Sequence, residues 1–271
     1  EFKNEKREAK EGLTTGDDFR FARMWWEVDF INIDLPSVHD FDFYGPYCSV
    51  GSKWQTFAKG GSLSPYYTDF KMICNWEHHA YEMSVCNKSF IRNLQHQYRP
   101  GITWTLRSSR YTPSVLPRGT VFSVRSKVAF ALDNNVEALI AIGNSEIYDT
   151  LYKMKLGRFG HPEFKGGVAN VMPIPEEGLM ASSLELREYF ESGYHSALVP
   201  YLSDEISRLY EDCWYKKLEC TNLYKASEKY HNLLSSQESK IKNRQKKVND
   251  LALELYQLDE ADSPSERLQS N

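Results

Sequence analysis

The pattern of apolar residues in the C-terminal third constrains the fold most strongly. After Ser182 this pattern predicts helix almost throughout. One seam of a heptad repeat is marked by four apolar residues, seven positions apart: Leu234, Ile241, Val248 and Leu255. The intermediate seam is apolar at its end but carries Gln237 and Arg244 earlier. Because that seam is imperfect, we expect a long helix that packs against another helix rather than a free dimeric zipper.

The pattern differs between residues 44 and 124, where short runs of β-favouring residues alternate with Gly, Pro, Asn and Ser turns. Three such runs predict strands: Met72–Trp76, Gly101–Leu106 and Thr120–Val124. Apolar residues from Val136 to Met154 then recur at helical spacing and predict a helix. Strand-like runs followed by helices predict an α+β fold, in which a mixed β-sheet precedes an α-helical part.

The N-terminal segment is charged, and residues 1–11 predict the end of an exposed helix that stops at Gly12. Asp17 and Asp18 have turn and helix N-cap chemistry, and Phe19–Val28 predicts a buried short helix or strand. The chain does not begin with Met, so we expect a fragment of a longer polypeptide. We expect the present chain to divide into four parts. Residues 1–11 are the end of a preceding helix or linker, and residues 12–180 are a mixed-sheet domain. Residues 181–260 are a coiled-coil-like helical spacer, and residues 261–271 are a disordered tail.

Charge is distributed unevenly along the 271 residues, although the formal net charge is only −4. Residues 53–170 carry 15 Lys and Arg against 8 Asp and Glu, whereas the segments before and after them are net acidic. A basic middle between acidic ends indicates a localised anionic partner such as a nucleic acid.

Composition also restricts the cellular environment. No stretch approaches the roughly 18 consecutive apolar residues of a membrane helix, and the charged start is unlike a signal peptide. The five cysteines form no Cys-x-x-Cys pair, which is typical of reduced intracellular thiols. We therefore expect a cytoplasmic protein with no membrane association.

The segment Arg99–Val124 is the strongest candidate for binding a polyanion. It contains four arginines among hydroxyl side chains, together with Trp104 and Tyr111, and it contains no acid. Guanidinium groups match phosphate oxygens and guanine edges. The turn Lys59-Gly60-Gly61, with Lys53 nearby, adds a second candidate, because glycines allow a close backbone approach and lysine meets phosphate.

Other readings of these residues stay open. Arg107 and Arg110 could instead pair with surface carboxylates. Two further groups have the residue types of metal or nuclease sites: Cys74, His78, His79 and Cys86; and Asp149, Glu163 and Lys165. The spacing of the first group fits no known zinc module, and glycines and a proline around the second favour a loop, so we expect no metal site. The chain also has no Asn-Pro-Pro-(Tyr/Phe) tetrapeptide, and we expect no catalytic residue in it.

Ordered motifs along the chain resemble one family. Gly12–Val28 is similar to the GLxTGDNxxFxRxWWEV segment of large bacterial adenine-specific DNA methyltransferases. These are the PglX-type enzymes of BREX phage-defence systems and the related type IIG/IIL restriction–modification polypeptides. Further similarities follow in order: Lys53–Tyr67 with KWxPYxKGGExRKWYG, Ile73–Trp76 with VVNW, Arg99–Val124 with xxGITWxxxSSxxFSxRxLPxGxxFDV, Gly166–Pro175 with VGDIxxxPIP, and ELYQLDEAD with xLYGLxDE.

The resemblance implies that residues 12–180 form a target-recognition domain for double-stranded DNA, downstream of a catalytic methyltransferase domain of the same polypeptide. S-adenosylmethionine and adenine N6 methylation would belong to that parent enzyme, and we expect no cofactor in this fragment. The expected phosphate contacts are Lys53, Lys59, Arg110 and Arg158, beside Gly60 and Gly61. The expected groove contacts are Trp104, Arg107, Ser108 and Ser109.

Two alternatives remain. The chain could be a protein-interaction module whose acidic helical tail docks another defence-system protein. It could also be part of a bifunctional restriction endonuclease–methyltransferase, with a nuclease domain elsewhere in the parent.

Overall fold

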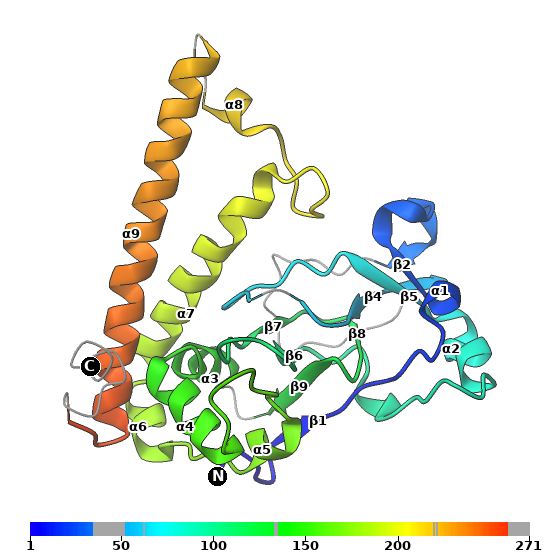
Figure 1. The fold of residues 1–271 in the computed structure, drawn as a ribbon, viewed down its shortest axis with the longest axis horizontal. Coiled ribbons are helices and arrows are strands. Elements are labelled where there is room, and N and C mark those ends of the chain that lie inside the picture. The colour runs from blue at the N-terminus through cyan, green and yellow to red at the C-terminus, as the bar shows by residue number, and fades with distance from the viewer. Residues whose placement is uncertain (35–51, 62, 133–134, 219, 221, 260–271) are drawn as a thin grey trace.

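The computed structural model describes residues 1–34, 52–61, 63–132, 135–218, 220 and 222–259. Two β-sheets lie next to each other, and short helices cover one of them (Figure 1). Two long helices extend away from this base (Figure 1). The predicted α+β class is therefore confirmed.

An antiparallel sheet with the strand order β1-β9-β6-β7 forms the base of the described structure. Its strands are β1 (Arg7–Lys10), β6 (Gly101–Thr105), β7 (Ser114–Leu116) and β9 (Ser126–Ala131). Side chains alternate between its two faces. Ile102 and Ala129 face a large core shared with the helices, whereas Val128 and Phe130 pack with Phe122 towards the second sheet. Both faces are thus covered, and β9 is buried along its whole length.

The prediction of a helix over residues 1–11 is wrong, because Arg7–Lys10 is an edge strand that pairs with β9. The side chain of Asn4 accepts hydrogen bonds from the backbone N–H groups of Lys6 and Arg7 and turns the chain into the strand. Arg7 is 3% exposed and pairs with Glu176 at 2.8 Å. Tertiary pairing with an open sheet edge therefore overrides the local helical preference of this segment.

The second sheet has the order β2-β5-β4-β3, with β8 also paired to β4. Its strands are β2 (Ala22–Met24), β3 (Ile33–Asp34), β4 (Trp54–Ala58), β5 (Met72–Asn75) and β8 (Val121–Phe122), and α1 (Asp18–Phe21) and α2 (Glu77–Ser84) adjoin it. Strands β5, β6 and β8 confirm the three predicted β runs. The sheet is mixed, because β4 is antiparallel to β5 but parallel to β3 and β8.

The segment Phe19–Val28 is only partly as predicted. Asp17 caps α1, since its side chain accepts a hydrogen bond from the Arg20 N–H at 3.1 Å. Phe21 is fully buried, but Phe19 is 92% exposed. The expectation that this whole element is buried is therefore wrong at Phe19, because the short helix turns that ring away from the core.

The helix predicted over Val136–Met154 is divided into α3 (Val136–Gly143) and α4 (Glu146–Leu156). Ser145 ends the continuity, because its hydroxyl accepts the Tyr148 N–H at 3.1 Å and caps a new helix. The side chain of Asn144 donates to the carbonyl of Pro113 at 2.9 Å. The hydrogen bond from Asn144 thus joins the junction of α3 and α4 to Pro113, which precedes β7.

The remaining helices are α5 (Gly166–Asn170), α6 (Glu176–Ala181), α7 (Ser183–Leu198), α8 (Trp214–Lys217) and α9 (Leu223–Leu255), with 3₁₀ turns at Trp25–Glu27, Phe30–Asn32, Leu94–His96 and Val199–Ser203. Of these helices, α7, α8 and α9 form the part that extends from the base, whereas α5 and α6 lie at the base (Figure 1). Helix α9 packs along α7, as the imperfect heptad predicted (Figure 1). Val248 is fully buried, but Ile241 is 39% exposed. Residues 204–213 are not helical, so the predicted helix is interrupted there.

The predicted boundary between residues 180 and 181 falls in α6, and the predicted tail at 261–271 lies outside the described residues. Within the described part of the chain, no helix has both the length and the apolar character needed to cross a lipid bilayer.

Candidate nucleic-acid interface

The loop from Arg107 to Arg110 is fixed at both ends. Before it, the Leu106 N–H donates to the carbonyl of Arg125 at 3.1 Å, and the Leu106 carbonyl accepts from Phe164 at 2.7 Å. After it, the buried Tyr111 N–H donates to the Asp149 carboxylate at 2.7 Å. The exposed Arg107 is therefore presented from a well-anchored loop.

Tyr111 anchors the loop through its side chain as well. It packs against a group of buried aromatic rings, with centroids 4.9–5.6 Å away: Trp104, Tyr148, Tyr152 and Phe164. Burial raises the pKa of the Tyr111 hydroxyl well above its usual value, so this ring is a neutral core element. The loop thus rests on a rigid aromatic base.

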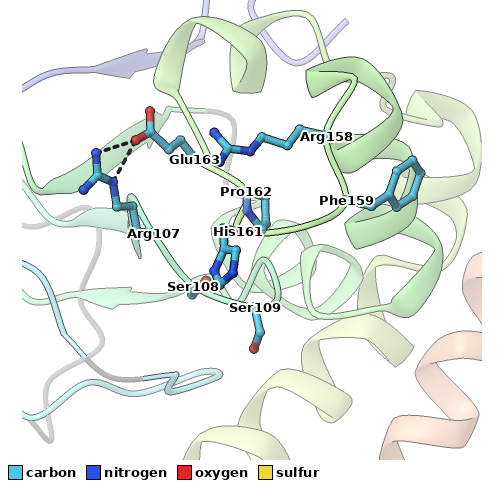
Figure 2. A pocket seen from close by; sticks show the side chains of 8 residues that line it. All are labelled: Arg107, Ser108, Ser109, Arg158, Phe159, His161, Pro162 and Glu163. Carbon is cyan, nitrogen blue, oxygen red and sulfur yellow. Dashed lines mark hydrogen bonds and ion pairs between the residues drawn. The ribbon is translucent and has the colours of Figure 1, made fainter.

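Arg107, Ser108 and Ser109 line a concave pocket of about 730 Å³. The opposite side is formed by the segment 158–163, including Arg158, Phe159 and His161 (Figure 2). Four of the residues predicted to contact DNA therefore lie together, although about 50 residues separate the two segments. We call this site the Arg107 pocket.

An acid also lies in the Arg107 pocket. Arg107 is 68% exposed and donates to Glu163 through Nε at 2.7 Å and through Nη2 at 2.6 Å (Figure 2). Both nitrogens contact the same oxygen, Oε1, and this charged contact lowers the pKa of the Glu163 carboxyl. The reading in which arginines pair with surface carboxylates is thus correct for Arg107. The pair remains open to solvent, so an incoming phosphate could compete for the guanidinium.

The Lys59–Gly61 turn lies next to the end of strand β6. The Gly60 N–H donates to Ser126 Oγ at 2.8 Å, and Thr105 Oγ1 donates to the Gly61 carbonyl at 3.4 Å. Gly60 has a φ of +72°, and a Cβ added there would meet no atom within 4 Å. The glycine therefore meets a backbone requirement and leaves open space beside Lys59, which forms an ion pair with Asp18.

Other predicted contacts are placed differently. Trp104 is 3% exposed, and its Nε1–H donates to the Phe164 carbonyl at 2.8 Å. The expectation of a groove contact is corrected for Trp104, because its ring belongs to the core beneath the loop. Lys53 pairs with Glu77 at 2.8 Å and lies outside the pockets described here. Arg110 is half-buried. Burial raises the pKa of the nearby Tyr66 hydroxyl, and the positive charge of Arg110 offsets a small part of that rise.

Two basic residues were missed by the sequence reasoning. Arg125 is exposed and follows β8, and its carbonyl bonds to Leu106, next to Arg107. Lys88 lines a further pocket together with Lys59 and Arg125. The only sequence signal for either residue was its position in the net basic segment. Lys88 and Arg125 therefore add two cations to the candidate interface that the sequence analysis had not predicted.

The group Asp149, Glu163 and Lys165 has structural roles. Asp149 pairs with Lys153 at 2.7 Å in addition to holding Tyr111, and Glu163 pairs with Arg107. The Lys165 carbonyl accepts from the Tyr152 hydroxyl at 2.7 Å. Among the residues that the structure describes, no group of three or more His, Cys, Asp and Glu side chains has the arrangement of a metal site.

Comparison with known proteins gives an independent line of evidence. No family model matches the chain. A stretch of 135 residues is 29% identical to the adenine-specific methyltransferase PglX of Lacticaseibacillus casei strain Zhang, covering 46% of this chain and 11% of that protein. A stretch of 129 residues is 31% identical to the adenine-specific methyltransferase BrxX of Escherichia coli O9:H4 strain HS, covering 47% of this chain and 10% of that protein.

This chain is similar to a segment of adenine-specific methyltransferases. The resemblance predicted from the motifs is confirmed at that level, and it relates the chain to a methyltransferase-associated region. The match spans only about a tenth of each relative's length.

Proposed function

We propose that this chain is the target-recognition region of an adenine-specific DNA methyltransferase of the PglX type. In this proposal it binds double-stranded DNA sequence-specifically on behalf of a catalytic domain in the same polypeptide, which acts in phage defence or restriction–modification. The observation that carries the proposal is the Arg107 pocket, where two arginines and two serines from distant segments surround one concave surface. The names of the two relatives favour the methyltransferase context.

The geometry supports two kinds of DNA contact, one to phosphates and one to base edges. Arg158 and Lys59, on either side of the loop, suit phosphate contacts, which set affinity and position but carry no sequence information. Arg107, Ser108 and Ser109 project from an anchored loop, and an arginine fork can read the O6 and N7 atoms of guanine. A fixed loop limits the entropy lost on binding.

S-adenosylmethionine belongs to the proposed parent and not to this region. The cofactor carries a positive sulfonium, whereas the Arg107 pocket is lined by Arg107 and Arg158. Two arginines do not favour a cationic group.

Fluorescence anisotropy with labelled duplex DNA of random sequence tests the proposal. We expect binding that weakens steeply with salt, because neutralised phosphates release counterions. Arg107→Ala should weaken binding, by about 1–3 kcal/mol at one base position if the arginine reads guanine, and uniformly if it contacts phosphate. Lys247→Ala is the matched control, because it removes an exposed positive charge from α9.

Failure to detect salt-sensitive binding at any accessible protein concentration would exclude the proposal for the isolated chain. That result would favour the protein-interaction alternative, in which the helical part docks another defence-system protein.

A further inference from the structure

A second pocket lies next to the Lys59–Gly61 turn. It has a volume of about 570 Å³ and is lined by residues 13–19, Lys59, Lys88 and residues 123–125. We call it the Phe19 pocket. Lys59 is the only residue in it that the sequence analysis predicted to contact DNA.

Backbone contacts hold one side of the Phe19 pocket in place. Thr14 and Phe90 exchange two backbone hydrogen bonds, at 2.8 and 2.9 Å. Gly16 has a φ of +68°, and a Cβ there would lie 2.2 Å from the Lys88 carbonyl oxygen. Only glycine fits so close to Lys88 in this conformation. The loop around Gly16 is thus pressed onto the backbone that carries Lys88.

The other side is equally well fixed. The Leu13 N–H donates to the Phe122 carbonyl at 3.0 Å, and the Val124 N–H donates to the Leu13 carbonyl at 2.8 Å. These bonds place Arg125 at the wall of the pocket. Since two sides are held by backbone bonds between separate segments, the pocket is preformed and needs little ordering on binding.

The charges in the Phe19 pocket favour an anionic ligand. Asp18 is paired with Lys59, and Asp17 caps α1. Burial works against ionisation of Asp18, but Lys59, Thr15 and Arg125 together lower its pKa. Lys88 and Arg125 are exposed, and within the described residues neither forms an ion pair. The pocket therefore has three cations against two acids, and Lys88 and Arg125 are the cations without an acidic partner among the described residues.

Among anionic ligands, the exposed ring of Phe19 favours one that carries a flat aromatic group. Its ring is 92% exposed at the pocket, which is an unfavourable position for a large apolar side chain in water. An exposed aromatic ring beside cations is the arrangement that proteins use to stack an unpaired nucleobase while holding its phosphates.

We propose that the Phe19 pocket receives an unpaired nucleobase, which stacks on Phe19 while Lys88 and Arg125 hold the adjoining phosphates. This inference rests on the proposed function, because an enzyme that rotates a base out of a duplex leaves an unpaired partner base. The Arg107 pocket and the Phe19 pocket then contact one DNA molecule, since Arg125 bonds to the residue that precedes Arg107.

Two labelled duplexes test the inference. One is fully paired, and in the other a single adenine is replaced by an abasic site, which leaves its partner thymine unpaired. We expect the wild-type chain to bind the second duplex about fivefold or more tightly, as stacking on one aromatic side chain supports. Phe19→Ala should abolish this preference while leaving the affinity for the paired duplex nearly unchanged. Phe19→Trp should retain the preference. Tyr224→Ala is the matched control, because Tyr224 is 80% exposed on α9.

The possible results separate this inference from the proposed function. Equal affinity of the wild-type chain for both duplexes, or a preference that survives Phe19→Ala, would overturn the Phe19 inference and leave the proposed function standing. Binding to neither duplex would overturn both. Arg107→Ala should weaken binding to both duplexes by the same factor, which distinguishes the two pockets. Circular dichroism of Phe19→Ala checks that the exposed substitution leaves the fold intact.

Discussion

Arg244 on α9 lies over the ring of Tyr66, with its guanidinium carbon 5.5 Å from the ring centroid. Its Nη1 also donates to the Ser192 carbonyl at 2.8 Å and to the Ser196 hydroxyl at 3.1 Å on α7. A polar residue at a heptad seam position thus joins both long helices to a ring that packs against Phe190. From α9, Arg244 therefore contacts both α7 and the Tyr66 ring.

Arg244→Ala should lower the free energy of unfolding by about 1–3 kcal/mol, because the hydrogen bonds from the buried guanidinium to α7 are lost and the cation–π contact disappears. Urea unfolding followed by circular dichroism measures this. Lys247→Ala, three residues further along α9 and exposed, should change the free energy by less than about 0.5 kcal/mol. Equal effects of the two substitutions would contradict a special role for Arg244.

Gly193→Ala should also destabilise the chain through its contact with Tyr66. A Cβ at Gly193 would lie 2.8 Å from three atoms of Tyr66, which is 3% exposed and cannot move aside. Overpacking of this kind costs about 1–3 kcal/mol. Gly167→Ala in α5 is the matched control, because nothing lies within 4 Å of its added Cβ, and it should be neutral or slightly stabilising. Thermal unfolding compares the two.

Asp149→Ala should impair both stability and the proposed DNA binding. It leaves the buried Tyr111 N–H without an acceptor, at a cost of about 1–3 kcal/mol, and releases the end of the arginine loop. Asp149→Asn retains an acceptor oxygen and loses only the charge, so it should preserve most of the affinity for duplex DNA. If both variants bound DNA like the wild type, Asp149 would have no role in positioning the loop.

The Arg107–Glu163 pair predicts a pH dependence. Arg107 lowers the pKa of Glu163, so the pair is fully formed above the ordinary glutamate pKa and is lost as the pH falls through the lowered value. Carboxyl-carbon NMR of Glu163 should give a midpoint below 4.5, the usual value. Arg107→Ala should return the midpoint to the usual range. A midpoint that Arg107→Ala does not change would show that the contact is absent in solution.

Glu163→Gln should strengthen binding to duplex DNA about two- to fivefold, because it removes an acid that competes with phosphate for Arg107. The gain should shrink at high salt, since it is electrostatic. Anisotropy titrations at two salt concentrations measure it. Glu205→Gln, a change of the same type in the segment after α7, should leave the affinity unchanged.

Local patterns predicted the elements that depend on local chemistry. The runs behind β5, β6 and β8 were recognisable because β-favouring residues stand between turn residues, and the Asp17 cap follows from its side chain alone. The edge strand β1 was not recognisable, because only its pairing with β9, more than 100 residues away, makes it a strand.

The same distinction applies to the candidate site. Residue type identified Arg107, Ser108, Ser109 and Arg158, and the fold brings them into one pocket. Residue type could not separate Trp104, which is buried, from an exposed aromatic residue such as Phe19. Arg125 was missed because its neighbourhood with Leu106 arises from a single backbone hydrogen bond between distant segments.

That hydrogen bond has a mechanical consequence. The Leu106 N–H donates to the Arg125 carbonyl, so a backbone hydrogen bond holds the main chain of Arg125 beside the main chain that leads into Arg107. In the proposed complex with DNA, this backbone contact sets the separation of the two pockets, and the arginine side chains adjust only the ends of the contact.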